Sequence, residues 1–509
     1  MSLGGQPQGR RRATEGAQGT VGDAILSRTT LFTVLGTLFP GVGLIAAGRR
    51  IAGGVILGVF LLGAVGIGVY ALVDRPGLIA LVLNPNFLRP FAVSLIVLAV
   101  AWVSIIIASH LALRPTSSHK IQRVVGGVVV ALMAFVVAAP SAVAARYSYD
   151  SATLVSSVFQ AQGKSKSATR PTTKPSSQRD PWAGTPRLNV LLLGGDSDAG
   201  KRDGVRTDTV MVASIDTKTG DTTLIGLPRN TERMPFPSSS PLHKYYPNSF
   251  TSGTSGDPFF LLNAMYGQVP LKVPKNILGA TDNLGADVMK VSVGEAVGLK
   301  IDYYALLDIQ GLRQLINALG GITVNINTRV AVGGDTDAHI PPKRWLEPGP
   351  KQHLAGYDAM WFARGRYGAD DFQRMDRQRC VVNAIIDQVN PANIVSRYEA
   401  VARASQSLVL TDIPQELLPA FVDLALKVKN GSQRSLVFKS GVGGFVSSHP
   451  NYYLVQEKVK QAIGEATRTG KAQKATSSAS STSKASKKAP SSGKNASQDM
   501  NDACAYHPG

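Results

Sequence analysis

Four apolar stretches in the first 150 residues constrain the fold of this chain more than any other feature. Their approximate bounds are residues 30–48, 51–73, 91–113 and 124–146. The last three reach the ~20 residues that span a bilayer. The first is interrupted by Pro40 and Gly41, and only Arg49 and Arg50 separate it from the second. Residues 29–147 are therefore expected to form a membrane region.

Basic residues around these stretches suggest a topology, because Lys and Arg in short loops tend to stay on the cytoplasmic side. Arg28, Arg49 and Arg50 share that side with a polar arm, residues 1–28, if the first stretch enters and returns without crossing. The arm is expected to be disordered. On this hypothesis the chain is a multi-pass protein of the cell membrane, and everything after about residue 147 is extracytoplasmic. Four full crossings place the rest of the chain in the cytoplasm instead.

The net charge of +20 raises the question of nucleic acid as a partner. Many basic residues lie in flexible flanks beside the membrane region, where anionic lipid or wall polymer is the more common partner. We therefore expect a lipid membrane and no nucleic acid. The chain has two cysteines, Cys380 and Cys504, which exclude a cysteine-based metal cluster. One bridge between them remains open, but we favour two unpaired thiols, because Cys504 lies beyond a long flexible tail and spacing alone does not show proximity.

Composition divides the remaining chain into three parts. Residues 148–187 are rich in Ser, Thr, Lys and Pro, as linkers are. Residues 188–466 alternate strand-like and helical patterns, which predicts an α/β layered domain. The spans 282–297 and 371–389 are expected helices, the first with Asp282 as its N-cap. Residues 467–509 have few large apolar side chains and are expected to be a disordered tail.

The stretch 189–233 contains three short strand-like runs, at 190–193, 210–215 and 222–227. Asp196 and Asp208 lie at the end of the first run and the start of the second, so folding can bring both carboxylates to one sheet edge. Carboxylates of this kind suit Mg²⁺. Residues 195–201 also match seven positions of a nucleotide phosphate loop, but Arg202 stands where the Mg²⁺-binding hydroxyl belongs. We therefore favour a metal pair over a phosphate loop.

Arginines accompany these acids in two groups, and their guanidinium forks match phosphate oxygens. They are Arg206, Arg229, Arg233, Arg364, Arg366, Arg374 and Arg377. In the expected helix 371–389, Arg374, Arg377 and Gln378 share a face. Asp370 and Asp371 precede them, where capping of the helix is the favoured role and acid or base chemistry the alternative.

Seven motifs in order now point to a family. They are LLLGGDSD, VRTDTVMVASID, GLPRN, LLNAMYG, IDYYALLDI, ALGGITVNI and WFARGRYGADDFQRMDRQR. Together they resemble the LytR-CpsA-Psr family over about residues 188–390. The resemblance implies an α-β-α layered sandwich with an apolar cleft for a lipid tail. Apolar residues in 259–262 and 288–297 are candidates for this cleft, although core packing is their commoner fate.

The resemblance also implies an activity. It is a membrane-anchored phosphotransferase that moves a glycopolymer, such as teichoic acid, from a polyprenyl pyrophosphate carrier to peptidoglycan with Mg²⁺ or Mn²⁺. Asp196 and Asp208 then take the metal positions, and Asp208 and Arg229 are the catalytic pair. The pyrophosphate positions are Arg206, Arg229, Arg233, Arg364, Arg366, Arg374 and Gln378. Hydrolysis of the same pyrophosphate, or a non-catalytic role as membrane regulator or scaffold, are the alternatives.

Overall fold

The structure is a computed structural model. It describes residues 29–74, 77, 81, 84–114, 120–161, 163–171, 182–196, 205–336, 338–388, 409–476 and 497–507. The chain divides into two compact units, Met1–Thr153 and Leu154–Gly509, which are treated separately below.

Among the described residues up to Val158, three helices are long and apolar enough to cross a membrane. They are α3 (Arg50–Val73), α5 (Pro85–Leu113) and α6 (Lys120–Val158). The first apolar stretch instead forms a helix over Thr29–Leu38 and the short α2 (Val42–Ala46), with Gly41 between them. Gly41 has a φ of 101°, and a Cβ there would lie 2.3 Å from the Gly53 carbonyl oxygen. The expected break in this stretch is confirmed, while the membrane topology stays a prediction.

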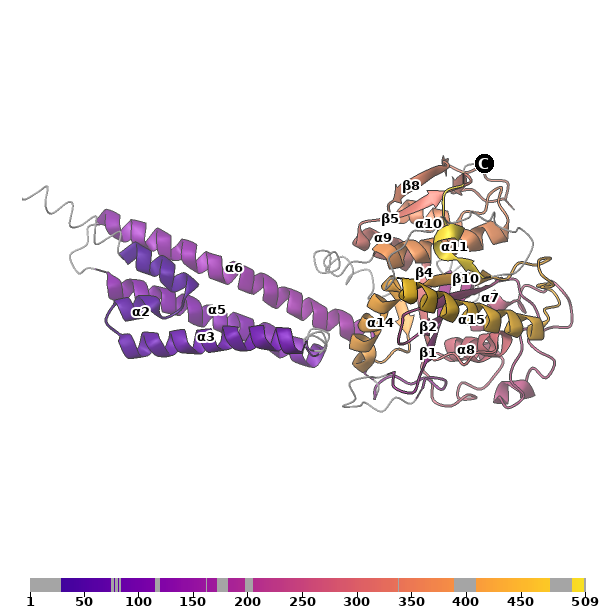
Figure 1. Ribbon diagram of the computed structural model, residues 1–509, viewed down its shortest axis with the longest axis horizontal. Helices are drawn as coiled ribbons and strands as arrows, with labels where there is room; N and C mark the ends of the chain where they lie inside the picture. Colours follow the sequence, from indigo (N-terminus) through magenta and orange to yellow (C-terminus); the bar gives the residue numbers. More distant parts are fainter. Residues whose placement is uncertain are drawn as a thin grey trace, which may run out of the picture. The chain divides into compact units, whose positions relative to one another are not determined.

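A mixed seven-stranded sheet organises the second unit, in the order β11-β10-β3-β2-β1-β4-β9. Figure 1 labels β1, β2, β4 and β10 among its strands. Its strands are β1 (Arg187–Asp196), β2 (Arg206–Asp216), β3 (Thr222–Leu227), β4 (Tyr303–Asp308), β9 (Val409–Thr411), β10 (Gln433–Val437) and β11 (Gln498–Asp499). Strand β1 pairs antiparallel with β2 and parallel with β4. The ends of β1 and β4 and the start of β2 therefore meet at one edge of the sheet.

Helices cover both faces of this sheet, because alternate side chains of each strand point to opposite faces. Leu191 and Leu193 of β1 pack with α7 (Leu262–Gln268), α8 (Leu284–Val297) and α15 (Tyr452–Thr476). Leu192 belongs to the opposite face. That face carries α9 (Ile309–Leu319), α11 (Asp371–Gln388), α14 (Leu418–Asn430) and α16 (Met500–Ala503). The expected α-β-α layering is confirmed.

A smaller cluster lies beside the main sheet, built on two short strand pairs. Strand β5 (Ile322–Ile326) pairs with β8 (Gly349–Leu354), and β6 (Val330–Val332) pairs with β7 (Arg344–Leu346). Their apolar side chains share a core with α10 (Gly356–Arg364) and with Val381 of α11. Helix α11 thus joins the two cores. Short 3₁₀ turns complete the described elements at η2 (Pro241–Lys244), η3 (Val269–Leu271) and η4 (Gln415–Leu417).

The region expected to be a linker is partly built into the domain. Residues 148–158 continue helix α6, so the expected boundary at residue 148 is wrong. Further on, the Ser167 hydroxyl donates to Asp287 and to Asp412 at 2.9 and 3.0 Å. Asp412 also pairs with the buried Lys290 ammonium at 2.7 Å. The carboxylates that neutralise Lys290 therefore also hold this segment on the domain.

The N-cap of helix α8 lies one residue later than predicted. Asn283 is the N-cap, and its Oδ1 accepts from the Ala286 N–H at 3.1 Å. Asp282, the expected cap, accepts from the Lys166 N–H at 2.8 Å instead. Gly298 ends the helix with a φ of 69°, as the sequence indicated. The predicted cap was wrong because a distant segment takes the Asp282 carboxylate.

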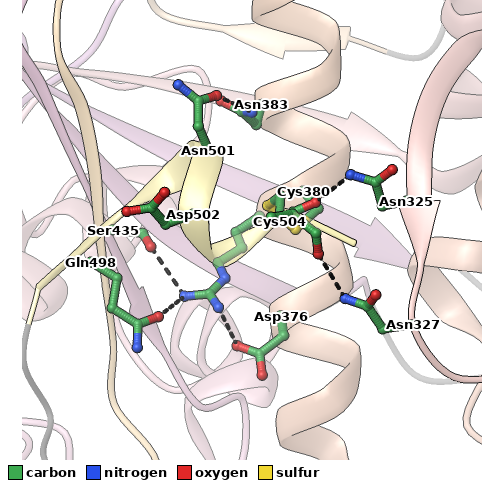
Figure 2. Close-up of a disulfide and its surroundings, with 12 residues drawn as sticks. Asn325, Asn327, Asp376, Cys380, Asn383, Ser435, Gln498, Asn501, Asp502 and Cys504 are labelled. Carbon is green, nitrogen blue, oxygen red and sulfur yellow. Dashed lines mark hydrogen bonds and ion pairs between the residues drawn. A yellow bond between two sulfur atoms is a disulfide. The ribbon is translucent and has the colours of Figure 1, made fainter. Parts of the chain in front are cut away.

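The expectation of a disordered tail over 467–509 is wrong at both described ends of that span. Helix α15 continues to Thr476, and β11 pairs antiparallel with β10. The expectation of two unpaired thiols is also wrong, since Cys380 and Cys504 form a disulfide with Cα atoms 5.6 Å apart (Figure 2). We call residues 497–507 the C-terminal segment. It lies against α11, the helix that follows Asp370.

Candidate functional site

A β-bulge places Asp208 at the sheet edge where β1 ends. Gly194 faces Thr209 across the ladder and Gly195 faces Thr207, so Asp208 is the extra residue of β2. Bulges re-aim a side chain relative to the regular alternation of a strand. Asp196 stands opposite Arg206 in the backbone register, which confirms that the two predicted acids belong to adjoining strand ends. The Asp196 side chain lies outside the described residues.

Four charged side chains from three segments meet here. The Arg229 guanidinium donates from Nη1 to Asp208 Oδ1 at 3.0 Å and from Nε to Asp371 Oδ1 at 3.2 Å. Arg374 Nη2 forms an ion pair with the same Asp371 oxygen at 2.9 Å and donates to the Asp208 carbonyl oxygen at 3.3 Å. The sheet edge, the loop after β3 and helix α11 are thereby linked. We call Asp208, Arg229, Asp371 and Arg374 the ionic network.

Asn263 of α7 extends this network and was not predicted from the sequence. Its Nδ2 donates to Asp208 Oδ1 at 3.0 Å, and its backbone N–H donates to the Arg229 carbonyl oxygen at 3.0 Å. The side chain is only 3% exposed. Its position in the LLNAMYG motif was the signal that could have found it, because a polar residue among apolar ones needs a partner when buried.

The two acids at the start of α11 have different roles. Asp370 Oδ1 accepts from the Gln373 N–H at 2.7 Å, which is capping geometry. Asp371 instead turns its carboxylate to Arg229 and Arg374. The capping role favoured for both residues is therefore wrong for Asp371, which the arginines hold in the ionic network.

Burial and charge oppose each other at this site. Burial disfavours the Asp208 carboxylate, but Arg229, the Asn263 amide and Arg374 outweigh it and lower the pKa of Asp208. Burial likewise disfavours the Arg229 cation, yet Asp208 and Asp371 raise its pKa. At Arg374 burial prevails and lowers the pKa to about 10, although Asp371 opposes it. At neutral pH Asp208 is ionised and both arginines are cationic.

An apolar cavity of about 350 Å³ adjoins the ionic network. Its polar members are Asp208, Thr209, Arg364, Arg374 and Gln378, and its apolar walls come mainly from β1, β4, α9 and α11. The stretches first considered for a lipid cleft do not line it. Leu262, Val288 and Val293 are fully buried in the main core, which confirms core packing as their role.

The remaining predicted arginines lie in varied surroundings. Arg206 donates to the Pro258 carbonyl oxygen at 3.2 Å, and its guanidinium lies 6.0 Å from the Phe259 ring centre. Arg364 lies over Trp361 at 5.8 Å while lining the cavity. Arg366 is exposed, and its charge contributes to the lowered pKa of Arg374.

Three further residues complete the comparison with the sequence. Arg233 adopts a left-handed φ of 53°, and no contact of its side chain with the ionic network is found in the described structure. Gln378 donates to the Ala363 carbonyl oxygen at 3.4 Å. Arg377 does not line the apolar cavity that Gln378 lines. It donates instead to the carbonyl oxygens of Phe362 and Gly365. Its buried guanidinium thus supports the backbone on both sides of Arg364.

The oxygen atoms of the site fit a divalent cation. Asp371 Oδ2 and Asn263 Oδ1 are buried without a hydrogen-bond partner among the described residues. Groups of three or more His, Cys, Asp or Glu placed for a metal are not found in the described part of the chain. Mg²⁺, however, commonly uses one or two carboxylates together with water and substrate phosphate. The donor set is therefore suited to a hard cation that binds with a phosphorylated ligand.

The chain is similar to known proteins over part of its length. The chain is 27% identical over 230 residues to the Enterococcus faecalis polyisoprenyl-teichoic acid–peptidoglycan teichoic acid transferase TagU. The aligned residues are 44% of this chain and 61% of that protein. It is 25% identical over 228 residues to the Bacillus subtilis transferase TagV, covering 44% of this chain and 50% of that protein. The matches thus span about half to three fifths of these relatives.

A solved structure and a family model extend the comparison. The crystal structure of B. subtilis TagV aligns with a TM-score of 0.38 and 21% identity, over 55% of this chain and 96% of that one. The model of the LytR_cpsA_psr family matches residues 152–469. That span is more than half of the chain and includes every residue of the ionic network. The chain belongs to the LytR_cpsA_psr family.

Proposed function

We propose that this chain is a membrane-anchored phosphotransferase. Its donor is a glycopolymer of the teichoic acid type carried on polyprenyl pyrophosphate, and its acceptor is peptidoglycan. One observation carries the proposal: an ionic network with two arginines adjoins an apolar cavity of about 350 Å³. Such a cavity falls within the range of roughly 300–1,000 Å³ typical of ligand pockets. A charged pyrophosphate joined to an apolar chain needs this combination of surroundings.

The arginines account for binding of the pyrophosphate. Arg364 and Arg374 line the cavity beside Gln378, and guanidinium groups bind phosphate oxygens through paired hydrogen bonds. Arg229 is held between Asp208 and Asp371, so it is oriented before a ligand arrives. Preorganised positive charge of this kind stabilises the negative charge that builds on the leaving phosphate.

A divalent cation completes the proposed site. Asp208, with Asp196 as its predicted partner and Asp371 nearby, would hold Mg²⁺ or Mn²⁺. When bound, the cation would neutralise phosphate charge as a Lewis acid. In the transfer itself, an acceptor hydroxyl oxygen bonds to the phosphorus that carries the glycopolymer. The bond from that phosphorus to the bridging oxygen breaks, polyprenyl phosphate leaves, and the hydroxyl proton passes to water.

The location of the domain is part of the proposal. Transfer to peptidoglycan requires an extracytoplasmic domain, and the Cys380–Cys504 disulfide supports this side of the membrane, because structural disulfides persist in oxidising compartments. A fusion at residue 165 to a reporter that is active only outside the cytoplasm should be active. Activity of a cytoplasm-only reporter at the same position would contradict the topology.

Purified full-length protein, Mg²⁺, lipid-linked polymer and peptidoglycan provide the direct assay. Covalent joining of polymer to peptidoglycan supports transfer, whereas release of free polymer phosphate alone identifies a hydrolase. Asp208→Ala and Arg229→Ala should each abolish joining while the protein still reaches the membrane. Full function of both variants would identify a regulator or scaffold. Removal of divalent cations with EDTA should stop the reaction, and added Mg²⁺ or Mn²⁺ should restore it.

A further inference from the structure

Helix α11 separates two cavities of opposite character. Arg374 and Gln378 line the apolar cavity of the proposed active site. Asn383 and Asp387, on the other side of the helix, line a second cavity of about 180 Å³ whose walls are mostly polar. The main sheet and the motifs of the first cavity do not contribute to the second. It is therefore a distinct hollow that the proposed transfer reaction does not use.

The C-terminal segment closes this second cavity. Its walls come from α11, from β5 and β8, and from Asn501 and Cys504 of the segment. The disulfide ties the segment to α11, while Asn325 donates to the Cys504 carbonyl oxygen at 2.8 Å and Asn327 donates to the Ala505 carbonyl oxygen at 3.0 Å. Figure 2 shows these contacts around the disulfide. The attached C-terminal segment therefore forms one wall of the cavity.

Some polar groups of the wall already have protein partners. Gln388 exchanges hydrogen bonds with both the N–H and the carbonyl oxygen of Thr323, at 2.9 and 3.1 Å. Asn325 accepts from the Lys351 N–H at 2.8 Å while donating to Cys504. These groups fix the shape of the wall and offer a ligand little.

Asn383 is the exception. Its side chain is 7% exposed and lines the cavity, and its Oδ1 has no hydrogen-bond partner among the described residues. Its Nδ2 donates to Asp387 Oδ2 at 3.2 Å and to Asn501 Oδ1 at 3.5 Å. A buried acceptor without a partner costs roughly 1–3 kcal/mol. The cavity therefore holds a fixed acceptor that needs a donor from outside the described protein.

The charges of the wall decide which class of ligand fits. One cation, Lys351, and one anion, Asp387, line the cavity, and no ion pair of either is found in the described part of the chain. The single carboxylate is a poor site for a bare metal ion, and it repels phosphate. A ligand that donates to Asn383 and Asp387 and accepts from Lys351 satisfies all three groups. Hydroxyl groups do both, since each is donor and acceptor.

We propose that this cavity binds one ring of a neutral saccharide. Its volume is below the roughly 300–1,000 Å³ of pockets for drug-sized ligands, which suits a single ring better than a longer oligosaccharide. Neighbouring rings of a glycan extend into solvent. The proposal does not rest on the transferase activity, because the binding residues lie outside the ionic network and need neither donor lipid nor divalent cation.

Saturation-transfer NMR on the full-length protein tests it, in a detergent without a sugar headgroup. N-acetylglucosamine, galactose and rhamnose are the probes, with inorganic phosphate and Ca²⁺ as competitors. At least one sugar should bind saturably, and neither competitor should displace it. Asn383→Leu and Lys351→Met should each weaken its binding by roughly tenfold. Lys343→Met is the matched control, because Lys343 is an exposed lysine just before β7 that does not line the cavity, and this variant should bind the sugar as the unaltered protein does.

Three results would overturn the proposal. They are no binding of any of the sugars by the unaltered protein, unchanged binding by Lys351→Met, and displacement of the sugar by phosphate or Ca²⁺. Titration of free thiols checks that the disulfide is intact in every variant. If Asn383→Leu fails to fold, Lys351→Met decides, because the exposed Lys351 side chain has no structural role in the core.

Discussion

Substitution of Asp371 by Asn tests whether the ionic network depends on one carboxylate. Asp371 Oδ1 accepts from Arg229 Nε at 3.2 Å and forms an ion pair with Arg374 Nη2 at 2.9 Å. Asn keeps an acceptor oxygen but removes the charge. A hydrogen bond between charged groups contributes roughly 1.5–3 kcal/mol and a neutral one roughly 0.5–1.5. Two bonds that each weaken by about 1–1.5 kcal/mol lower kcat/KM by roughly 30- to 150-fold.

Asp370→Asn is the matched control. It removes the same charge from the same helix terminus, but Asp370 contacts the Gln373 N–H and not the arginines. Asn caps a helix about as well as Asp, so both stability and kcat/KM should stay within about twofold of the unaltered protein. Joining of lipid-linked polymer to peptidoglycan, followed at several donor concentrations, measures both variants.

Two results would contradict this role of Asp371. An equal loss of activity in the two variants would mean that charge at the start of α11 matters through the helix dipole, and not through the arginines. Full activity of Asp371→Asn would mean that Arg229 needs no second carboxylate. A thermal unfolding curve for each variant separates these results from simple loss of folding.

Three further predictions concern stability, followed by tryptophan fluorescence in urea. Cys504→Ser should lower the free energy of unfolding by roughly 2–5 kcal/mol, and reductant should lower it equally in the unaltered protein; indifference to reductant would contradict this. Lys290→Met should cost about 3–5 kcal/mol because it leaves Asp412 buried without its cation, and Lys290→Met with Asp412→Asn should cost less than the single change. The lowered pKa of Asp208 means that its stabilising contribution is complete above its ordinary pKa of about 3.9 and is lost as pH falls through the lowered value. Asp208→Asn should remove this acid-dependent loss of stability. An unchanged pH profile of the free energy of unfolding would count against the pairing of Asp208 with Arg229.

Local patterns predicted most of the sheet and the helices that carry the site. The run predicted at 222–227 is a strand over those residues, because its apolar and β-branched side chains favour strands. The expected helix from 371 ends at Gln388. Its spacing also placed Arg374 and Gln378 on one cavity wall. Periodicity carries this information because it acts within a few residues.

Long-range partners account for what the sequence could not predict. Asp282 and Asp371 are both credible caps by position, but Lys166 and two arginines bind their carboxylates instead. Asn263 meets Asp208 from 55 positions away along the chain. Cys380 and Cys504 pair across a separation of 124 residues. No local propensity distinguishes such partners, since folding of the whole domain brings them together.

The disulfide also imposes an order on biosynthesis. At roughly 5–20 residues per second, the 124 residues from Cys380 to Cys504 take roughly 6 to 25 seconds to synthesise. Throughout that interval the Cys380 thiol has no intended partner, and Arg379 of the same helix lacks Gln498. Strand β10 likewise lacks its antiparallel partner β11 until residues 498–499 have been synthesised. The covalent link between the helix that bears Arg374 and the C-terminal segment can therefore form only after residue 504 has been synthesised.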